Sequence, residues 1–213
     1  VDPHVVWVRV ETADEQVGVT SRYVYTVYGS GDVVLEHAVE LDTTLPPVPR
    51  VGVRLVMPAG YERFDWYGLG PHDTYADRKV GARVGVYRST VDDQYVAYIK
   101  PQEHGNKAEV RWAALTDENG VGLLAVGMPL LNVSAQHYTA HDLAAAMHTH
   151  ELQRRDDITL DLDYAQSGLG SESCGPGVLP AYRLERQAYR YRLRLRPLAG
   201  RGDSPIGLSK RVF

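Results

Sequence analysis

The sequence has little cysteine, little net charge and no long apolar run. Cys174 is the single cysteine among 213 residues, so an internal disulfide is excluded and a reducing compartment, the cytoplasm, is expected. The net charge is only −4, which provides no basic surface for nucleic acid. No apolar run approaches the ~20 residues of a membrane-spanning helix, and the amino terminus lacks a signal-peptide pattern. Neither nucleic acid nor a membrane is therefore expected as a partner.

Helix-forming sequence is also scarce, whereas valine and tyrosine recur with a period of two, which is typical of strands with one buried face. Turn signals such as Gly29-Ser30-Gly31-Asp32 separate the segments. The pattern predicts an all-β fold with two packed antiparallel sheets in one domain. The predicted strands are Val5–Val10, Gly18–Tyr28, Val33–Leu41, Arg50–Met57, Tyr61–Tyr67, Asp93–Ile99, Lys107–Leu115, Gly122–Met128, Asn132–Tyr138, Ile158–Tyr164 and Tyr189–Arg196.

Three further segments depart from simple alternation. Thr139 and Asp142 stand at capping-box spacing and predict one short helix of about two turns. Residues 198–213 are rich in Gly, Pro and Arg without a period, and we expect a partly mobile tail. Arginines at every second position of 190–196 predict a strand with one cationic face, at a solvent-facing edge or against a partner.

The densest group of chemically active side chains lies between Trp66 and Trp112. Aromatic rings beside charged groups are typical of a sugar pocket, where rings stack and charges bind hydroxyls. A purely structural interpretation is equally open, since Asp77 and Arg78 could lock a loop through ion pairs. Glu103 and Asn106 could likewise satisfy buried backbone donors. The candidate sugar-cleft residues are Trp66, His72, Tyr75, Arg78, Glu103, His104 and Trp112.

Four segments, in order, resemble the terminal domain of bacterial β-galactosidases of glycoside hydrolase family 2. They are Trp66-Tyr67-Gly68-Leu69-Gly70-Pro71 continuing to Tyr75-Ala76-Asp77-Arg78, then Pro101-Gln102-Glu103-His104-Gly105, then His148-Thr149-His150-Glu151-Leu152, and Gly168-Leu169-Gly170-Ser171-Glu172-Ser173-Cys174-Gly175-Pro176. His104 departs from the family's Asn and Ala76 from its Pro. Together the segments are far more specific than any single one, and the resemblance assigns residues 1–197 to this domain.

The resemblance implies a large antiparallel β-supersandwich, similar to that of galactose mutarotases. The family's catalytic glutamates lie on an upstream TIM barrel that these residues do not match, so this chain is expected to hold no catalytic residue and to be inactive alone. The parent enzyme would hydrolyse terminal β-D-galactosides, with magnesium and sodium only in its catalytic domain and no cofactor in this chain. The glycine-rich loop with Ser173, Cys174 and Gly175 would lie beside the substrate. Cys174 takes the place of a tryptophan found in some members, and a thiol offers no stacking face, so a packed thiol is the alternative role.

The resemblance also implies further strands before Val5, so the domain is expected to be truncated at its amino-terminal side. Exposed apolar surface or self-association into a homo-oligomer would follow. The expected partners are the upstream domains of the parent β-galactosidase, together with a β-galactoside or galactose.

Two other functions and one site remain as alternatives. The chain could be an aldose 1-epimerase with Glu103 as base and one of His72, His104 or His137 as acid. It could instead be a carbohydrate-binding module that uses Trp66, Tyr75 and Trp112 as platforms. His148 and His150 could hold a metal, but no third ligand follows at a recognisable spacing. A hydrogen-bonding role is therefore expected there and no metal site is predicted.

Overall fold

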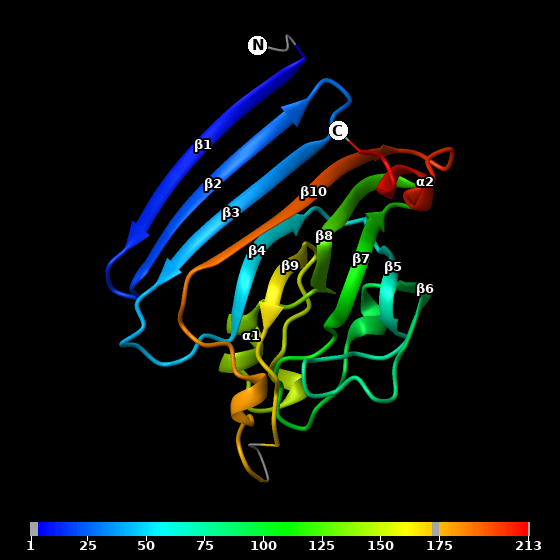
Figure 1. Cartoon of the computed structure of the whole chain (residues 1–213). Coiled ribbons are helices and arrows are strands. Elements are labelled where there is room, and N and C mark those ends of the chain that lie inside the picture. Colours follow the sequence, from blue (N-terminus) through cyan, green and yellow to red (C-terminus); the bar gives the residue numbers. More distant parts are fainter. Residues whose placement is uncertain (1–3, 172–174, 213) are drawn as a thin grey trace.

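The computed structural model describes residues 4–171 and 175–212, and within them the chain forms ten strands and a few short helices (Figure 1). The strands are β1 (Val5–Asp14), β2 (Val19–Tyr28), β3 (Val33–Leu41), β4 (Arg50–Met57), β5 (Arg63–Gly70), β6 (Arg83–Thr90), β7 (Lys107–Thr116), β8 (Val121–Gln136), β9 (Ile158–Gln166) and β10 (Tyr189–Ala199). The α-helices are α1 (Ala140–Ala145) and α2 (Pro205–Ser209), and the 3-10 turns are η1 (Asp92–Gln94), η2 (Thr149–Glu151) and η3 (Pro180–Tyr182).

The strands form one antiparallel sheet that branches at β8. Its main path runs β1-β2-β3-β10-β8-β7-β5-β6, while β9 pairs with β8 and β4 pairs with β9. The first half of β8 pairs with β10 up to Met128, and its second half, from Asn132 on, pairs with β9. One long strand therefore connects two branches, β10-β3-β2-β1 and β9-β4.

The apolar core fills the space that these two branches share with β5 and β7. One cluster of buried side chains includes Leu35 of β3, Leu193 of β10, Leu162 of β9 and Trp66 of β5. Alternation explains this, because every second residue of each strand faces the same side. The all-β antiparallel fold class is confirmed.

Most strand predictions are confirmed, and three differ. Residues 122–138 were predicted as two strands, but the structure continues one strand through Val121–Gln136. The predicted strand Asp93–Ile99 is wrong, because η1 opens this segment and irregular backbone follows. Strand β6 was missed, although its Val84 and Val86 alternate with polar residues or glycine.

The helical predictions need one addition. The capping box is present as expected, with the Thr139 side chain accepting from Asp142 N and the Asp142 carboxylate accepting from Thr139 N. A second α-helix, α2, lies inside the predicted tail, and its Leu208 is buried with Leu198 and Trp112. The mobility of residues 198–213 stays a prediction, but this helix anchors part of the segment to the sheet.

The arginine-rich strand does not lie at an edge, so that prediction is wrong. β10 is central, between β3 and β8. Arg194 is only 3% exposed because its guanidinium faces Asp32 at 3.3 Å and donates to the Leu208 carbonyl at 2.9 Å. For Arg194 and Arg196 the buried Asp32 carboxylate thus replaces the solvent that the alternation suggested, whereas Arg190 and Arg192 stay exposed.

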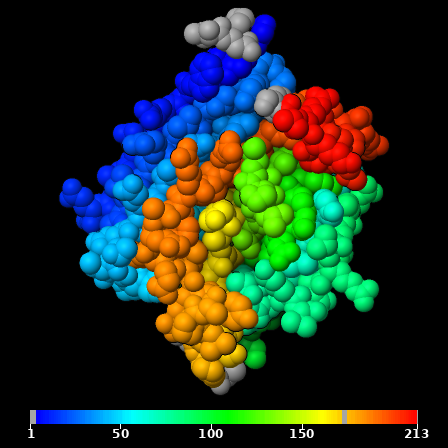
Figure 2. All heavy atoms as spheres, in the orientation of Figure 1, coloured from blue at the N-terminus to red at the C-terminus, as the bar shows by residue number. Residues whose placement is uncertain are grey.

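Strand β1 forms one edge of the sheet (Figures 1 and 2). It carries exposed apolar side chains. Val6, Val8 and Val10 are 59%, 46% and 39% exposed. They lie opposite Val27, Tyr25 and Tyr23 of β2, and those two tyrosines pack against the core. The core face of the sheet therefore continues outward, uncovered, onto β1. None of the helices in the described ranges has the length and apolarity that a membrane crossing requires.

Candidate functional site

The predicted aromatic platforms lie in the interior. Trp66 is 1% exposed, stacks between Phe64 and Tyr87, and donates its indole N–H to the Leu69 carbonyl at 3.0 Å. Trp112 is 3% exposed in the cluster under α2. Neither ring offers a free face, so neither can serve as a sugar platform in this fold.

Tyr75 and Glu103 belong to a partly buried polar network. The Tyr75 hydroxyl, on a residue only 1% exposed, donates to Glu103 Oε1 at 3.2 Å. Arg50 donates to Glu103 Oε2 at 2.7 Å and also to Asp161, which Arg54 binds at 2.7 Å. These contacts join the Pro101–Gly105 segment to β4 and β9, so Glu103 holds the loop as the structural interpretation predicts, but through side-chain donors in place of the predicted backbone donors.

Asp163 stands beside this network with a strongly perturbed carboxyl group. Burial raises the pKa of Asp163 to about 7, with Arg50 opposing the shift and Asp161 and Glu103 adding to it. A carboxylic acid of this kind beside other carboxylates is what a glycosidase general acid requires. A cavity lined by Glu103 and Asp161 measures about 10 Å³, whereas ligand pockets span about 300–1,000 Å³. The cluster is closed to a sugar, and it holds the loop.

The sequence did not point to Arg50, Asp161 or Asp163. In β9 the aspartates alternate with Leu160 and Leu162, which is the pattern of a strand whose polar face meets solvent. The structure covers this polar face with the loop before β7, and Asp161 and Asp163 are 7% and 3% exposed. Only the tertiary fold reveals that these charges are buried.

The histidines do not form an epimerase pair with Glu103. His72 is exposed, and His104 donates Nδ1–H to the Gln102 carbonyl at 2.8 Å, with Nε2 unpartnered and buried. His137 Nε2 lies 2.9 Å from Glu62. Both Glu103 oxygens are already bound by Tyr75 and Arg50, so the arrangement offers no free base across from an acid.

Asp77 and Arg78 clamp the glycine-rich loop. Asp77 accepts hydrogen bonds from the backbone N–H groups of Leu169 at 3.2 Å and Gly170 at 2.8 Å, and Arg78 donates to the Gly170 carbonyl at 2.9 Å. Gly168 packs directly on Asp77, because a Cβ there would lie 2.7 Å from the carboxyl carbon. The charge pair adjacent in sequence therefore fixes a loop about ninety residues later.

The loop itself stands at one end of the molecule. Ser173 and Cys174 lie outside the described residues, and Gly175 is exposed. The flanks of the loop meet where Ser171 N donates to the Pro176 carbonyl at 3.1 Å. The segment between β9 and η3 forms the end of the molecule opposite β1's first residues (Figures 1 and 2). This end of the molecule is exposed at several described residues of the segment, among them Ser171, Gly175 and Pro176.

A polar hollow of about 270 Å³ lies beside the clamp, between Ala76 and the end of β9. Lys79 and Glu109 pair across it at 3.0 Å, and Tyr164, 39% exposed, stands at its rim. Glu109 has a φ of 55°, an uncommon conformation for a residue with a side chain. The hollow supplies charges and a ring of the kind that the predicted sugar cleft required, but from other residues.

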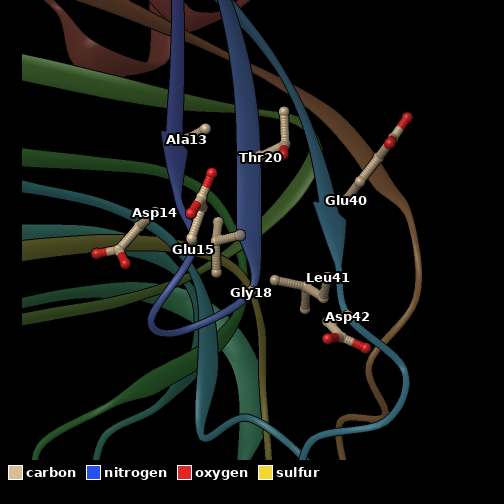
Figure 3. Close-up of a pocket in the computed structure, with 9 residues that line it drawn as sticks. Ala13, Asp14, Glu15, Gly18, Thr20, Glu40, Leu41 and Asp42 are labelled. Atoms are coloured by element: carbon tan, nitrogen blue, oxygen red, sulfur yellow. The ribbon is translucent and has the colours of Figure 1, made fainter.

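A second hollow, of about 440 Å³, lies at the turn between β1 and β2 and is lined by acids (Figure 3). Asp14 accepts from Gln16 N at 2.9 Å, and Asp42 accepts from Thr44 N at 2.9 Å. Figure 3 shows the carboxylates of Asp14, Glu40 and Asp42 pointing away from one another. These groups stabilise turns and do not converge on a ligand.

The chain matches the family model described as β-galactosidase small chain over residues 2–195. It is 35% identical over 176 residues to a β-galactosidase of Priestia megaterium, which covers 82% of this chain and 17% of that protein. A β-galactosidase of Vibrio vulnificus is 33% identical over 181 residues, covering 83% and 17%. The chain thus spans about a sixth of the length of these curated relatives.

Two solved structures align with much of the chain at low similarity. They are a GalM/aldose epimerase homologue from C. elegans, with a TM-score of 0.43 and 11% identity over 91% of this chain and 65% of that one, and a putative aldose 1-epimerase from Escherichia coli K12, with a TM-score of 0.35 and 10% identity over 90% and 68%. Both TM-scores are below 0.5, so the fold is defined by the strand order of this chain and not by these two structures.

Proposed function

Because this chain belongs to the β-galactosidase small-chain family, we propose that it serves as the non-catalytic terminal domain of a larger β-galactosidase. In that protein its clamped glycine-rich loop completes a galactoside site whose acid and nucleophile lie in another domain. Two findings together carry the proposal: the chain matches the small-chain family model over residues 2–195, and it covers only 17% of the β-galactosidase of Priestia megaterium.

The loop clamp supports the placement of the sugar. Asp77 fixes the backbone of Leu169 and Gly170, so the tip of the loop leaves a rigid base. A fixed base reduces the entropy lost when a loop orders against a ligand. Cys174, Ser173 and Gly175 are the proposed substrate-adjacent residues.

The closed carboxylate cluster supports a non-catalytic role. Glu103 and Asp161 are ion-paired with Arg50 around a cavity too small for a sugar. The groups that cleave the glycosidic bond, and any magnesium or sodium, belong in this proposal to the rest of the protein. The single cysteine is consistent with the cytoplasmic location that the proposal includes.

The uncovered face of β1 supports docking to more polypeptide. Val6, Val8 and Val10 continue the core face and stay 39–59% exposed. Contiguous apolar surface of this kind marks an interface. Further domains of the same protein are the proposed partner, and association of two copies through the same face is the route to a homo-oligomer.

A chimera tests the proposal. This chain would replace the matching 17% of the Priestia megaterium relative, and hydrolysis of a nitrophenyl β-galactoside would be measured. Activity is expected, with Asp77→Ala lowering kcat/KM by about tenfold or more because misplaced site groups are costly. The matched control is Asp14→Ala, an aspartate that holds a distant turn. An unchanged kcat/KM in a folded Asp77→Ala chimera would contradict the proposed role of the loop.

A further inference from the structure

A third candidate ligand joins the two histidines that the sequence placed side by side. His148, His150 and Glu151 each bring one ligand atom into a group whose members all lie within 4.8 Å of one another. His148 Nδ1 is 2.9 Å from Glu151 Oε1, and the two imidazole rings stack at 5.4 Å with an interplanar angle of 19°. The group is therefore assembled in the folded chain.

A single tight turn fixes the three backbones. His148 precedes η2, and Glu151 N donates to the His148 carbonyl at 3.1 Å while Leu152 N donates to the Thr149 carbonyl at 3.2 Å. The side chains leave this turn on one side and are all exposed. A ligand can reach them directly from solvent.

The carboxylate is oriented and charged. Met147 N donates to Glu151 Oε2 at 2.8 Å, which leaves Oε1 directed at His148. The hydrogen bonds from His148 and then Met147 lower the pKa of Glu151 below its usual value. Carboxylates that bind metals are commonly oriented by a hydrogen bond from a neighbouring group, as the Met147 N–H orients Glu151.

The spacing is close to that of a zinc site. Tetrahedral zinc with bonds of about 2.0–2.1 Å holds its donors about 3.3 Å apart. Distances of up to 4.8 Å between exposed side chains can close to this value if one imidazole turns out of the stack, so that both ring lone pairs point at the metal. Two imidazoles and a carboxylate are ordinary zinc ligands, and a water would complete the tetrahedron.

We propose that His148, His150 and Glu151 form a surface site for a divalent transition-metal ion of the zinc class. The metal replaces the proton that His148 Nδ1 shares with Glu151, so binding either releases a proton or moves it to Nε2. The competing interpretation is that the His148–Glu151 hydrogen bond only closes the turn. It differs in giving His150 no hydrogen-bonding role, since His150 stacks on His148 and acts on Glu151 only through its charge.

Calorimetric titration of the untagged, chelator-treated chain with zinc chloride at pH 7.5 tests the site. One equivalent is expected to bind, and the affinity is expected to fall at pH 5.5 because protonated imidazole is no ligand. His150→Ala and the isosteric Glu151→Gln should each weaken binding by about tenfold or more. Both residues are exposed, so circular dichroism should show an unchanged fold.

His141→Ala is the matched control, since His141 is an exposed histidine of the preceding helix and lies outside the group. Its affinity should equal that of the original chain. The proposal is overturned if no saturable binding occurs, or if His150→Ala binds as well as the original. It is also overturned if Cys174→Ser, and not His150→Ala, removes binding, because zinc would then be on the thiol.

Discussion

The two branches of the sheet share the same alternation of apolar and polar residues, but the apolar side chains of β9 are buried and those of β1 are exposed. In β9 the inward residues Ile158, Leu160 and Leu162 are 0–3% exposed, whereas in β1 the corresponding Val6, Val8 and Val10 are 39–59% exposed. Both sets continue one core face, because Val8 and Val10 lie opposite the core-facing Tyr25 and Tyr23. Alternation decides which side of a strand is apolar, and only the tertiary fold decides whether that side is covered.

The polar faces differ in the same way. On β9 the outward Asp161 and Asp163 are covered by the loop that Glu103 and Tyr75 hold, so residues 158–163 of this strand are packed on both sides. On β1 the outward Arg9 and Glu11 meet solvent and form only exposed ion pairs. The face of β9 is covered within this chain, and the face of β1 is the one that we propose a partner covers.

Truncation of one leucine should show the largest difference between the branches. Leu162→Ala removes a fully buried side chain and should lower the free energy of unfolding by about 2–5 kcal/mol. Val8→Ala, at 46% exposure, should cost less than about 0.5 kcal/mol. Urea unfolding of both variants measures the two values, and equal losses would mean that β1 is covered in solution.

The buried acid of β9 should make stability depend on pH. The pKa of Asp163 is raised from 3.8 to about 7, so the folded chain binds a proton that the unfolded chain has released. The protonated Asp163 stabilises the folded chain fully below about pH 4. This contribution falls as the pH rises from about 4 to about 7, and it is gone above about pH 7.

Asp163→Asn removes that loss. One pKa unit corresponds to about 1.4 kcal/mol. The free energy of unfolding of the variant, relative to that of the original chain, should therefore rise by about 1–4 kcal/mol between pH 4.5 and pH 8. Urea unfolding at the two pH values provides the comparison. A variant with the same pH slope as the original chain would show that Asp163 is ionised in the folded state.

Substitutions on the exposed face of β1 should change the association of the chain more than its free energy of unfolding. Val8→Thr combined with Val10→Thr keeps β-branched side chains and makes the uncovered face polar. We expect weaker concentration-dependent association in sedimentation velocity, with a change in unfolding free energy below about 0.5 kcal/mol. Identical sedimentation of the variant and the original chain would show that this face does not mediate contacts between copies.

Much of the fold could be predicted because its signals are local. Period two located most strands, and the hydroxyl and carboxylate of Thr139 and Asp142 located α1. The errors have physical reasons. Residues 93–99 alternate like a strand but are taken up by a 3-10 turn and irregular backbone. Arg194 and Arg196 of β10 find a buried aspartate in place of solvent.

The candidate site was predictable only in part. The motif segments identified the family, and adjacent charges at Asp77 and Arg78 indicated a locked loop. Which loop they lock depends on a contact across about ninety residues, which no local pattern encodes. The rings of Trp66 and Trp112 were predicted as platforms because composition does not distinguish a ring in the core from a ring in a cleft.

In the function that we propose, this chain has the framework of a sugar site without its reacting groups. The most direct measurement is hydrolysis of a nitrophenyl β-galactoside by the rigorously purified chain alone. We predict a rate equal to that of buffer. Turnover that disappears when Glu103 or Asp163 is replaced by its amide would contradict the claim, because it would place the acid or the nucleophile within these residues.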